Sequence, residues 1–167
     1  MSILPLVVAA IVTGGVDAAA VDAIHNEAEA RAAVKAVTDA DSLADIAAHS
    51  SKWRLRADAV YFLSDQSVVA KALADKDWQV RVSAVRKLAD VAVLKKVAGS
   101  DSEERVRAAA VMRIPDREFL EKLAKTEKSE LVRKFITKRL PAPVVVKTLE
   151  DLPKAKETTL DAITVRK

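Results

Sequence analysis

The chain has 167 residues, no cysteine, three glycines and a formal net charge of +4. Half of its residues are hydrophobic but only 4% are aromatic, so its apolar mass is mainly alanine, valine and leucine, which suit helix packing. Without cysteine the chain has no disulfide framework, thiolate metal site or cysteine nucleophile, and we expect a cytoplasmic protein.

Residues 1–12 are apolar except for Ser2, and the first basic residue is Arg31. This segment lacks the basic start of a secretory signal and is shorter than the roughly 20 apolar residues of a transmembrane helix. Its apolar residues precede those of segment 27–39 by 26 positions, which predicts the buried second helix of a degenerate first repeat. An atypical signal or a membrane-contacting segment is the alternative.

Four stretches further along align almost without gaps: 53–65, 78–90, 104–116 and 130–142. In this register Arg56, Arg81, Arg107 and Arg133 share one column, and the steps between them are 25, 26 and 26 residues. The apolar columns are Leu55/Val80/Val106/Val132, Ala59/Ala84/Ala110/Ile136 and Leu63/Leu88/Ile114/Leu140. Segment 27–39 is an earlier copy that lacks the arginine. A fixed period of this size indicates stacked supersecondary units.

Each unit contains two short helical patterns joined by a polar turn. The first helices are predicted at 43–49, 67–74, 91–97 and 118–125, and the second helices within the aligned stretches. We expect Ser51, Asp77 and either Asp101 or Ser102 to cap the second helices. After Pro143, segments 144–149 and 157–165 have the pattern of further helices.

These patterns predict an all-α fold, a right-handed α-α superhelix or solenoid of about six short helical pairs with a repeat of about 26 residues. Residues 1–167 form one domain in this interpretation. Residues 1–26 are a degenerate N-terminal repeat or cap, residues 27–142 are the core repeats, and residues 143–167 are a C-terminal cap.

Segments 77–88 (DWQVRVSAVRKL) and 101–112 (DSEERVRAAAVM) resemble HEAT repeats, whose second helix opens with an acidic turn followed by Val-Arg and spaced Ala and Leu. The resemblance covers residues 27–150. It implies a fold but says little about function. Ser50 stands where the other units have an acid before the arginine. The period is short for HEAT repeats and is also similar to that of leucine-rich variant repeats, in which one helix of each pair is a 3-10 helix.

The arginine column has an acid six residues before it in three units, and in HEAT arrays such pairs form a ladder between units. The resemblance therefore implies structural roles for the following residues: Arg56, Asp75, Arg81, Asp101, Arg107, Glu127 and Arg133. Arginine suits this role because its planar fork of donors can join carboxylates and turn carbonyls of adjacent units. Binding of phosphate by the same arginines is the alternative.

The opposite side of the second helices is the expected functional surface, because in HEAT-like arrays these helices line the concave face. Its predicted solvent-facing columns are Arg54/Gln79/Arg105/Leu131, Ala57/Val82/Ala108/Lys134 and Tyr61/Arg86/Met112/Lys138, with Phe62/Lys87/Arg113/Arg139 at the margin. Residues 81–140 hold 16 basic and 9 acidic residues, a net charge of +7, whereas residues 1–80 have a net charge of −4. A basic, partly apolar face suits an acidic partner or a phosphate backbone.

The candidate partner-binding residues on this face are Arg54, Tyr61, Arg86, Lys87, Arg105, Arg113, Lys134, Lys138 and Arg139. Trp53 and Trp78 occupy equivalent positions 25 residues apart, where they either pack between units or anchor a partner. The alternative for the charged residues is a solvated surface without a partner.

Catalytic and metal-binding patterns are not found in the sequence. The only histidines are His25 and His49, and His49 has only Asp45 one turn earlier. The sequence shows neither a glycine-rich phosphate loop nor a nucleophile elbow, and no cofactor or small-molecule substrate is expected.

Three functions remain open from the sequence. The first is a non-catalytic scaffold that binds an acidic protein or peptide, and the second is binding to the phosphate backbone of a nucleic acid. The third is an enzyme of the bilin lyase or DNA glycosylase type, which rests only on the analogy of HEAT-like folds.

Overall fold

The computed structural model describes residues 15–140, and within this range it contains ten α-helices, one 3-10 helix and no strand. The prediction of an all-α fold is confirmed for this part of the chain. The proposed helices at 1–12, 144–149 and 157–165 lie outside the described residues. No helix of residues 15–140 has the length and apolar character needed to cross a membrane.

The helices follow one another as alternating first and second helices of five successive pairs in residues 15–140. The first helices are α2 (Ala18–Asp22), α4 (Ala40–His49), α6 (Gln66–Lys71), α8 (Val91–Ser100) and α10 (Arg117–Thr126). The second helices are α3 (Glu27–Ala36), α5 (Trp53–Phe62), α7 (Trp78–Lys87), α9 (Glu104–Arg113) and α11 (Glu130–Arg139). A 3-10 helix, η1 (Ala72–Ala74), continues α6.

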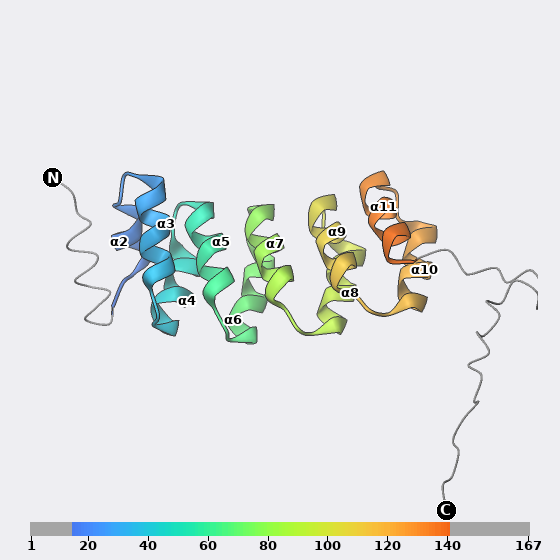
Figure 1. Ribbon diagram of the computed structural model, residues 1–167, viewed down its shortest axis with the longest axis horizontal. Helices are drawn as coiled ribbons and strands as arrows, with labels where there is room; N and C mark the ends of the chain where they lie inside the picture. Colours follow the sequence, from blue (N-terminus) through green and yellow to red (C-terminus); the bar gives the residue numbers. More distant parts are fainter. Residues whose placement is uncertain (1–14, 141–167) are drawn as a thin grey trace, which may run out of the picture.

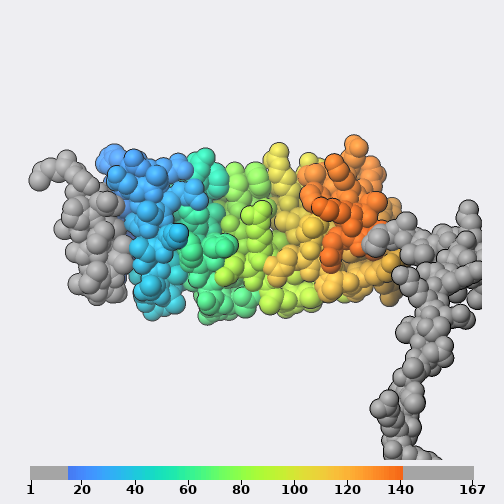
Figure 2. Space-filling view, in the orientation of Figure 1, coloured from blue at the N-terminus to red at the C-terminus, as the bar shows by residue number. Residues whose placement is uncertain are grey.

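The pairs are stacked in chain order along the longest axis of the molecule, as the unbroken colour sequence in Figures 1 and 2 shows. Each of the helices α5, α7, α9 and α11 packs directly on the second helix of the preceding pair. First helices of neighbouring pairs make few contacts from α4 to α10, so the pairs are held together mainly through their second helices.

Aspartates cap the first helices, whereas the capping expected from Ser51, Asp77 and Asp101 or Ser102 is wrong. The N-cap residues of α5, α7 and α9 are Lys52, Asp77 and Glu103, and none of their side chains makes a capping hydrogen bond. The carboxylates of Asp39, Asp65, Asp90 and Asp116 accept hydrogen bonds from backbone N–H groups in the first turns of α4, α6, α8 and α10. These residues satisfy donors that a helix start leaves without a partner. Asp77 stands at the N-cap of α7 but makes no capping hydrogen bond, because its carboxylate binds Arg56 instead.

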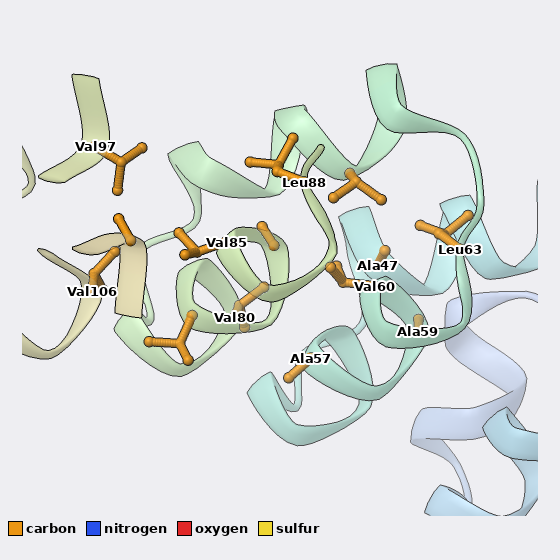
Figure 3. Packing of buried hydrophobic residues seen from close by; sticks show 14 of the residues in the cluster. Ala47, Ala57, Ala59, Val60, Leu63, Val80, Val85, Leu88, Val97 and Val106 are labelled. Atoms are coloured by element: carbon orange, nitrogen blue, oxygen red, sulfur yellow. The ribbon is translucent and has the colours of Figure 1, made fainter. Parts of the chain in front are cut away.

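The core consists of the repeated apolar columns of the second helices together with buried apolar residues of the first helices, such as Ile46, Leu94 and Leu120. Residues of the first two columns are at most 1% exposed, from Leu55 and Ala59 through to Val132 and Ile136. Figure 3 shows Val60, Val80, Val85 and Val106 among the side chains that fill the space between neighbouring helices. Burial of one such valine contributes about 1.5–3 kcal/mol, so these columns fix the register of the array.

One predicted surface column is wrong. Ala57, Val82 and Ala108 were expected to face solvent, yet their exposed fractions are 8%, 9% and 4%. Their column lies where each second helix packs against the next, and the close approach of these helices covers it. Lys134, the last member of this column, is exposed.

The 25-residue step between Arg56 and Arg81 has a local structural cause. The other first helices from α4 to α10 are ten residues long, whereas α6 and η1 together have nine. A 3-10 helix rises more per residue than an α-helix, so its tighter winding accommodates the missing residue. The remaining first helices of residues 15–140 are α-helical.

Candidate functional site

Arginines of the second helices reach across the boundaries between neighbouring pairs. Nε and Nη2 of Arg81 donate to the two carboxylate oxygens of Asp101, each at 2.9 Å. Arg107 binds Glu127 in the same way at 3.0 and 2.9 Å. Each acid lies 20 residues after its arginine, in the loop that leads to the next second helix. Two parallel charge-assisted bonds fix both the distance and the orientation of the partners.

The loop acids join successive arginines into one continuous arrangement. The carboxylate of Asp101 accepts from Arg81, and its backbone carbonyl accepts from Nη1 of Arg107 at 2.9 Å. Asp75 has the equivalent position between Arg56 and Arg81, with a carbonyl contact of 2.8 Å. We call this set the arginine ladder: Arg56, Arg81 and Arg107 with Asp75, Asp101 and Glu127.

Arg56 is the most buried member of the ladder, with an exposed fraction of 4%. It donates to both carboxylate oxygens of Asp75, at 2.7 and 3.0 Å, and also to Asp77. Its Nη1 donates to the carbonyl of Ser50 at 2.9 Å. A buried guanidinium requires such complete pairing, because an unpaired charge in this position would be costly.

The pKa values of the ladder residues shift in the directions that these contacts require. The hydrogen bond from Arg107 is the main reason why the pKa of Glu127 is lowered, and burial opposes it. Burial raises the pKa of Asp75, but the hydrogen bonds from Arg56 and the Asp77 backbone outweigh this, so the pKa is lowered overall. Both acids are therefore ionised partners of arginine in the folded chain.

The ladder changes at both ends of the described range. Ala30 stands in the arginine column of α3, so no arginine lies 20 residues before Ser50. The hydroxyl of Ser50 instead donates to Asp22 at 2.5 Å, and this explains why the acid is absent there. At the other end Arg133 is exposed, and its Nη1 lies 3.5 Å from the carbonyl of Glu127.

A groove lies across three second helices and is lined by several residues of the columns predicted to bind a partner. Its volume is about 430 Å³. Its lining consists of Trp78, Val82 and Arg86 from α7, of Arg105, Ala108, Ala109, Met112 and Arg113 from α9, and of Leu131 and Phe135 from α11. We call it the α9 groove, because α9 forms its floor and α7 and α11 its two walls.

The spacing of the lining residues shows how far the groove extends along α9. The α9 residues follow the order i, i+3, i+4, i+7 and i+8, which is one face of a helix, and the α7 residues follow i, i+4 and i+8. The lining therefore extends over about two turns of α9, with α7 and α11 on either side. Arg105 and Arg113 are eight residues apart, which corresponds to about 12 Å along the helix. Ala108 and Ala109 leave the middle of the floor free of large side chains.

The charges of the groove are located at its two ends. Arg105 lies at the start of α9, where its guanidinium stacks 4.9 Å from the centre of the Trp78 ring. Arg86 and Arg113 lie at the opposite end, in the last turns of α7 and α9. None of the lining residues is acidic, although Nη1 of Arg105 lies 3.6 Å from the carboxylate of Glu103, just before its own helix. Arg86 forms no ion pair within residues 15–140. The groove is thus apolar in its middle and basic at both ends.

Arg113 and Arg139 have a packing role that the sequence did not predict. Arg113 donates from Nη1 to the carbonyl of Arg86 and from Nη2 to that of Leu88 at 2.9 Å. Nη2 of Arg139 donates to the carbonyl of Ile114 at 2.9 Å. These carbonyls end the preceding second helices and lack partners within them. The two arginines cap these helix ends across the boundary between pairs, and Arg113 also lines the groove.

The other candidate residues on the N-terminal side lie outside the α9 groove. Arg54 forms an ion pair with Glu27 at 3.0 Å and stacks 4.5 Å from the Trp53 ring centre. Tyr61 is 58% exposed, and Nζ of Lys87 lies 5.7 Å from the centre of its ring. These residues therefore do not line the α9 groove together with Arg86, Arg105 and Arg113.

Lys134 and Lys138 are exposed on α11 and do not line the groove. The groove residues not identified from the sequence are Ala109 and Phe135. They share a column with Asp58 and Ser83, which are polar, so the repeat gave no reason to select this column. The change from polar to apolar residues along this column was the signal in the sequence that could have identified Ala109 and Phe135.

Residues 15–140 contain no group of three or more histidine, cysteine, aspartate or glutamate side chains arranged to hold a metal ion. Nδ1 of His49 lies 2.7 Å from the Asp45 carboxylate, and Asp45 also accepts from the backbone N–H of Ala18 at 2.8 Å. This contact joins α4 to the start of α2, so it has a structural explanation.

Comparison with known proteins gave no match among family models, curated proteins or solved structures.

Proposed function

We propose that this chain is a HEAT-like right-handed superhelix that binds a segment of another protein, without catalysis, on the face formed by its second helices. The α9 groove is the observation that carries this proposal. It combines a concave apolar floor with arginines at both ends, and protein recognition uses both kinds of contact. Arginine and aromatic residues such as Trp78 are frequent centres of binding energy at protein interfaces.

The packing of the helices supports the HEAT-like interpretation. Second helices of neighbouring pairs pack directly, whereas the first helices of neighbouring pairs make few contacts from α4 to α10. We infer that a row with this asymmetry curves toward the side of its second helices, with the α9 groove on its inner face. The arginine ladder between pairs also agrees with the HEAT-like pattern of the sequence.

The apolar centre of the groove favours a protein segment over a nucleic acid. Valine, alanine, methionine and phenylalanine line the space between its arginines, and none of them can bind a phosphate. A phosphate backbone presents one charge after another and suits a continuous row of basic residues. A protein segment with apolar and acidic side chains satisfies both parts of this groove.

The test is selection of binders from a displayed library of random peptides, with the groove blocked in a variant. Ala109→Trp fills the floor of the groove, and Ser83→Trp makes the same change one unit earlier as the matched control. We expect enriched peptides whose affinity falls at least about tenfold with Ala109→Trp and stays unchanged with Ser83→Trp. Circular dichroism of both variants checks the fold.

Two results would overturn the proposal. One is that no peptide is enriched on the unsubstituted chain relative to the Ala109→Trp variant. The other is tight, salt-sensitive binding of labelled single- or double-stranded DNA that requires Arg86 and Arg105, which would identify a nucleic-acid-binding face instead.

A further inference from the structure

The chemistry of the α9 groove restricts the kind of segment that can bind in it. Its apolar centre offers no free backbone group, because α7, α9 and α11 satisfy their backbone hydrogen bonds internally. The polar groups that its side chains contribute are concentrated at its ends. The occupant must therefore bring a backbone that needs no partner from the groove.

An extended peptide does not meet this requirement. Its N–H and C=O groups that face Val82, Ala108 and Phe135 would lose water without gaining a partner, and each such loss costs free energy. An α-helix satisfies its own backbone groups and presents only side chains to the groove. The apolar centre consequently selects a helix over an extended segment.

The two basic ends determine where the occupant carries its charge. Arg105 at one end and Arg86 with Arg113 at the other are separated by about 12 Å along α9, which is eight residues of an α-helix. A helix that lies along α9 with an acidic residue at each of two positions eight apart brings one carboxylate to each end. Charge-assisted bonds to arginine are short and directional, so this spacing matters.

The floor sets the size of the residues between these acids. Ala108 and Ala109 have small side chains, and the volume of about 430 Å³ above them accepts large apolar side chains. Helical positions i+3, i+4 and i+7 lie on the same face as i and i+8. Leucine, methionine or phenylalanine at these positions fills the groove in the manner of helix-in-groove recognition.

We infer that the partner segment is an amphipathic α-helix that lies along α9, with large apolar residues at its centre and one acidic residue at each end, eight positions apart. This inference rests on the proposed function and specifies its ligand class. A helix with basic ends, an extended segment and a nucleic acid are the occupants that it excludes.

The test uses a synthetic peptide of about 15 residues, held helical by a staple on its outer face. Its inner face carries glutamate at the fourth and twelfth positions and leucine at the seventh, eighth and eleventh. One control has glutamine in place of both glutamates, a second has lysine there, and a third moves the glutamates to the outer face. Fluorescence anisotropy with the full chain gives the affinities.

At low salt we expect the affinity of the glutamate peptide to be at least about tenfold higher than that of the glutamine and outer-face peptides. Arg86→Glu and Arg105→Glu should each weaken its binding and strengthen binding of the lysine peptide. Lys96→Glu on α8 produces the same change in net charge away from the groove and should alter neither affinity. Arg86 and Arg105 suit this test because the side chain of neither donates a hydrogen bond to another pair of helices within residues 15–140.

The outcomes separate this inference from the proposed function. Equal binding of the glutamate and glutamine peptides would overturn the inference. If library peptides then still bind in a manner sensitive to Ala109→Trp, the proposed function stands alone. If neither the designed helices nor any library peptide binds, both are wrong. Reversal of the peptide preference in Arg105→Glu, without a change in Lys96→Glu, is the result that supports the inference.

Discussion

Arg107 and Glu127 belong to different helical pairs, yet two parallel hydrogen bonds of 3.0 and 2.9 Å join them, and the Glu127 side chain is only 6% exposed. Nη1 of the same arginine binds the carbonyl of Asp101 in its own pair. One side chain thus joins the loop before its own helix to the loop of the next pair.

Removal of this arginine should destabilise the chain strongly. Arg107→Ala leaves the nearly buried Glu127 carboxylate without its partner, and we expect a loss of about 2–3 kcal/mol in the free energy of unfolding, measured by urea denaturation. Arg107→Lys should recover only part of this loss, because an ammonium cannot form the two parallel bonds. Equal stability of the lysine variant and the unsubstituted chain would contradict a role for the bidentate geometry.

The same contact predicts how stability depends on pH. The pKa of Glu127 is lower in the folded chain than in the unfolded chain, where it is about 4.3. Its contribution is therefore present above that value and is lost as the pH falls through the lower folded value. We expect the free energy of unfolding to decrease on acidification below about pH 4.3. Glu127→Gln should be less stable at neutral pH and show a smaller decrease, which urea titrations at several pH values would detect.

Two neighbouring arginines of the groove should behave differently in stability measurements. Arg113 donates to the carbonyls of Arg86 and Leu88, whereas Arg86 uses its side chain in no ion pair within residues 15–140. Arg113→Gln should lower the free energy of unfolding by about 1 kcal/mol, and Arg86→Gln should change it by less than about 0.5 kcal/mol. Similar losses in thermal and urea unfolding of both variants would show that Arg113 does not act as an inter-pair cap.

The helical pairs could be predicted from the sequence because the residue pattern that defines them is local and is repeated along the chain. The apolar columns recur every 25 or 26 residues, so the same packing problem is solved several times with the same residue types. The bounds of α8 and α10 lie within three residues of those expected from the pattern. One sequence is enough to detect this regularity, because its repeated units can be aligned with one another.

The sequence could not show how closely neighbouring second helices approach. Val82 and Ala108 belong to a column that faces away from the first helix of their own pair, so helical periodicity placed them in solvent. Their burial arises from contact between pairs, which depends on the angle at which the pairs stack. The inter-pair bonds of Arg113 and Arg139 have the same origin, because they connect residues that only the stacked arrangement brings together.

The N-terminal end of the arginine ladder permits a test of the rule behind it. An acid in the loop requires an arginine 19 or 20 residues earlier, as in Arg56 with Asp75 and Arg81 with Asp101. Ser50 follows Ala30 by 20 residues and binds Asp22 instead. Ser50→Asp alone would place a second carboxylate against Asp22, and we expect a loss of about 1–3 kcal/mol in the free energy of unfolding.

Addition of the missing arginine should reverse part of that loss. Ala30→Arg alone places a guanidinium in a buried position without a carboxylate at Ser50, so it should also be destabilising. In the double variant the two new side chains can form the pair seen between Arg81 and Asp101, and the losses should not add. A double-mutant cycle by urea denaturation should give a favourable coupling of at least about 1 kcal/mol. Additive losses would show that the spacing of arginine and acid alone does not create a rung, and that the loop geometry of the later pairs is also required.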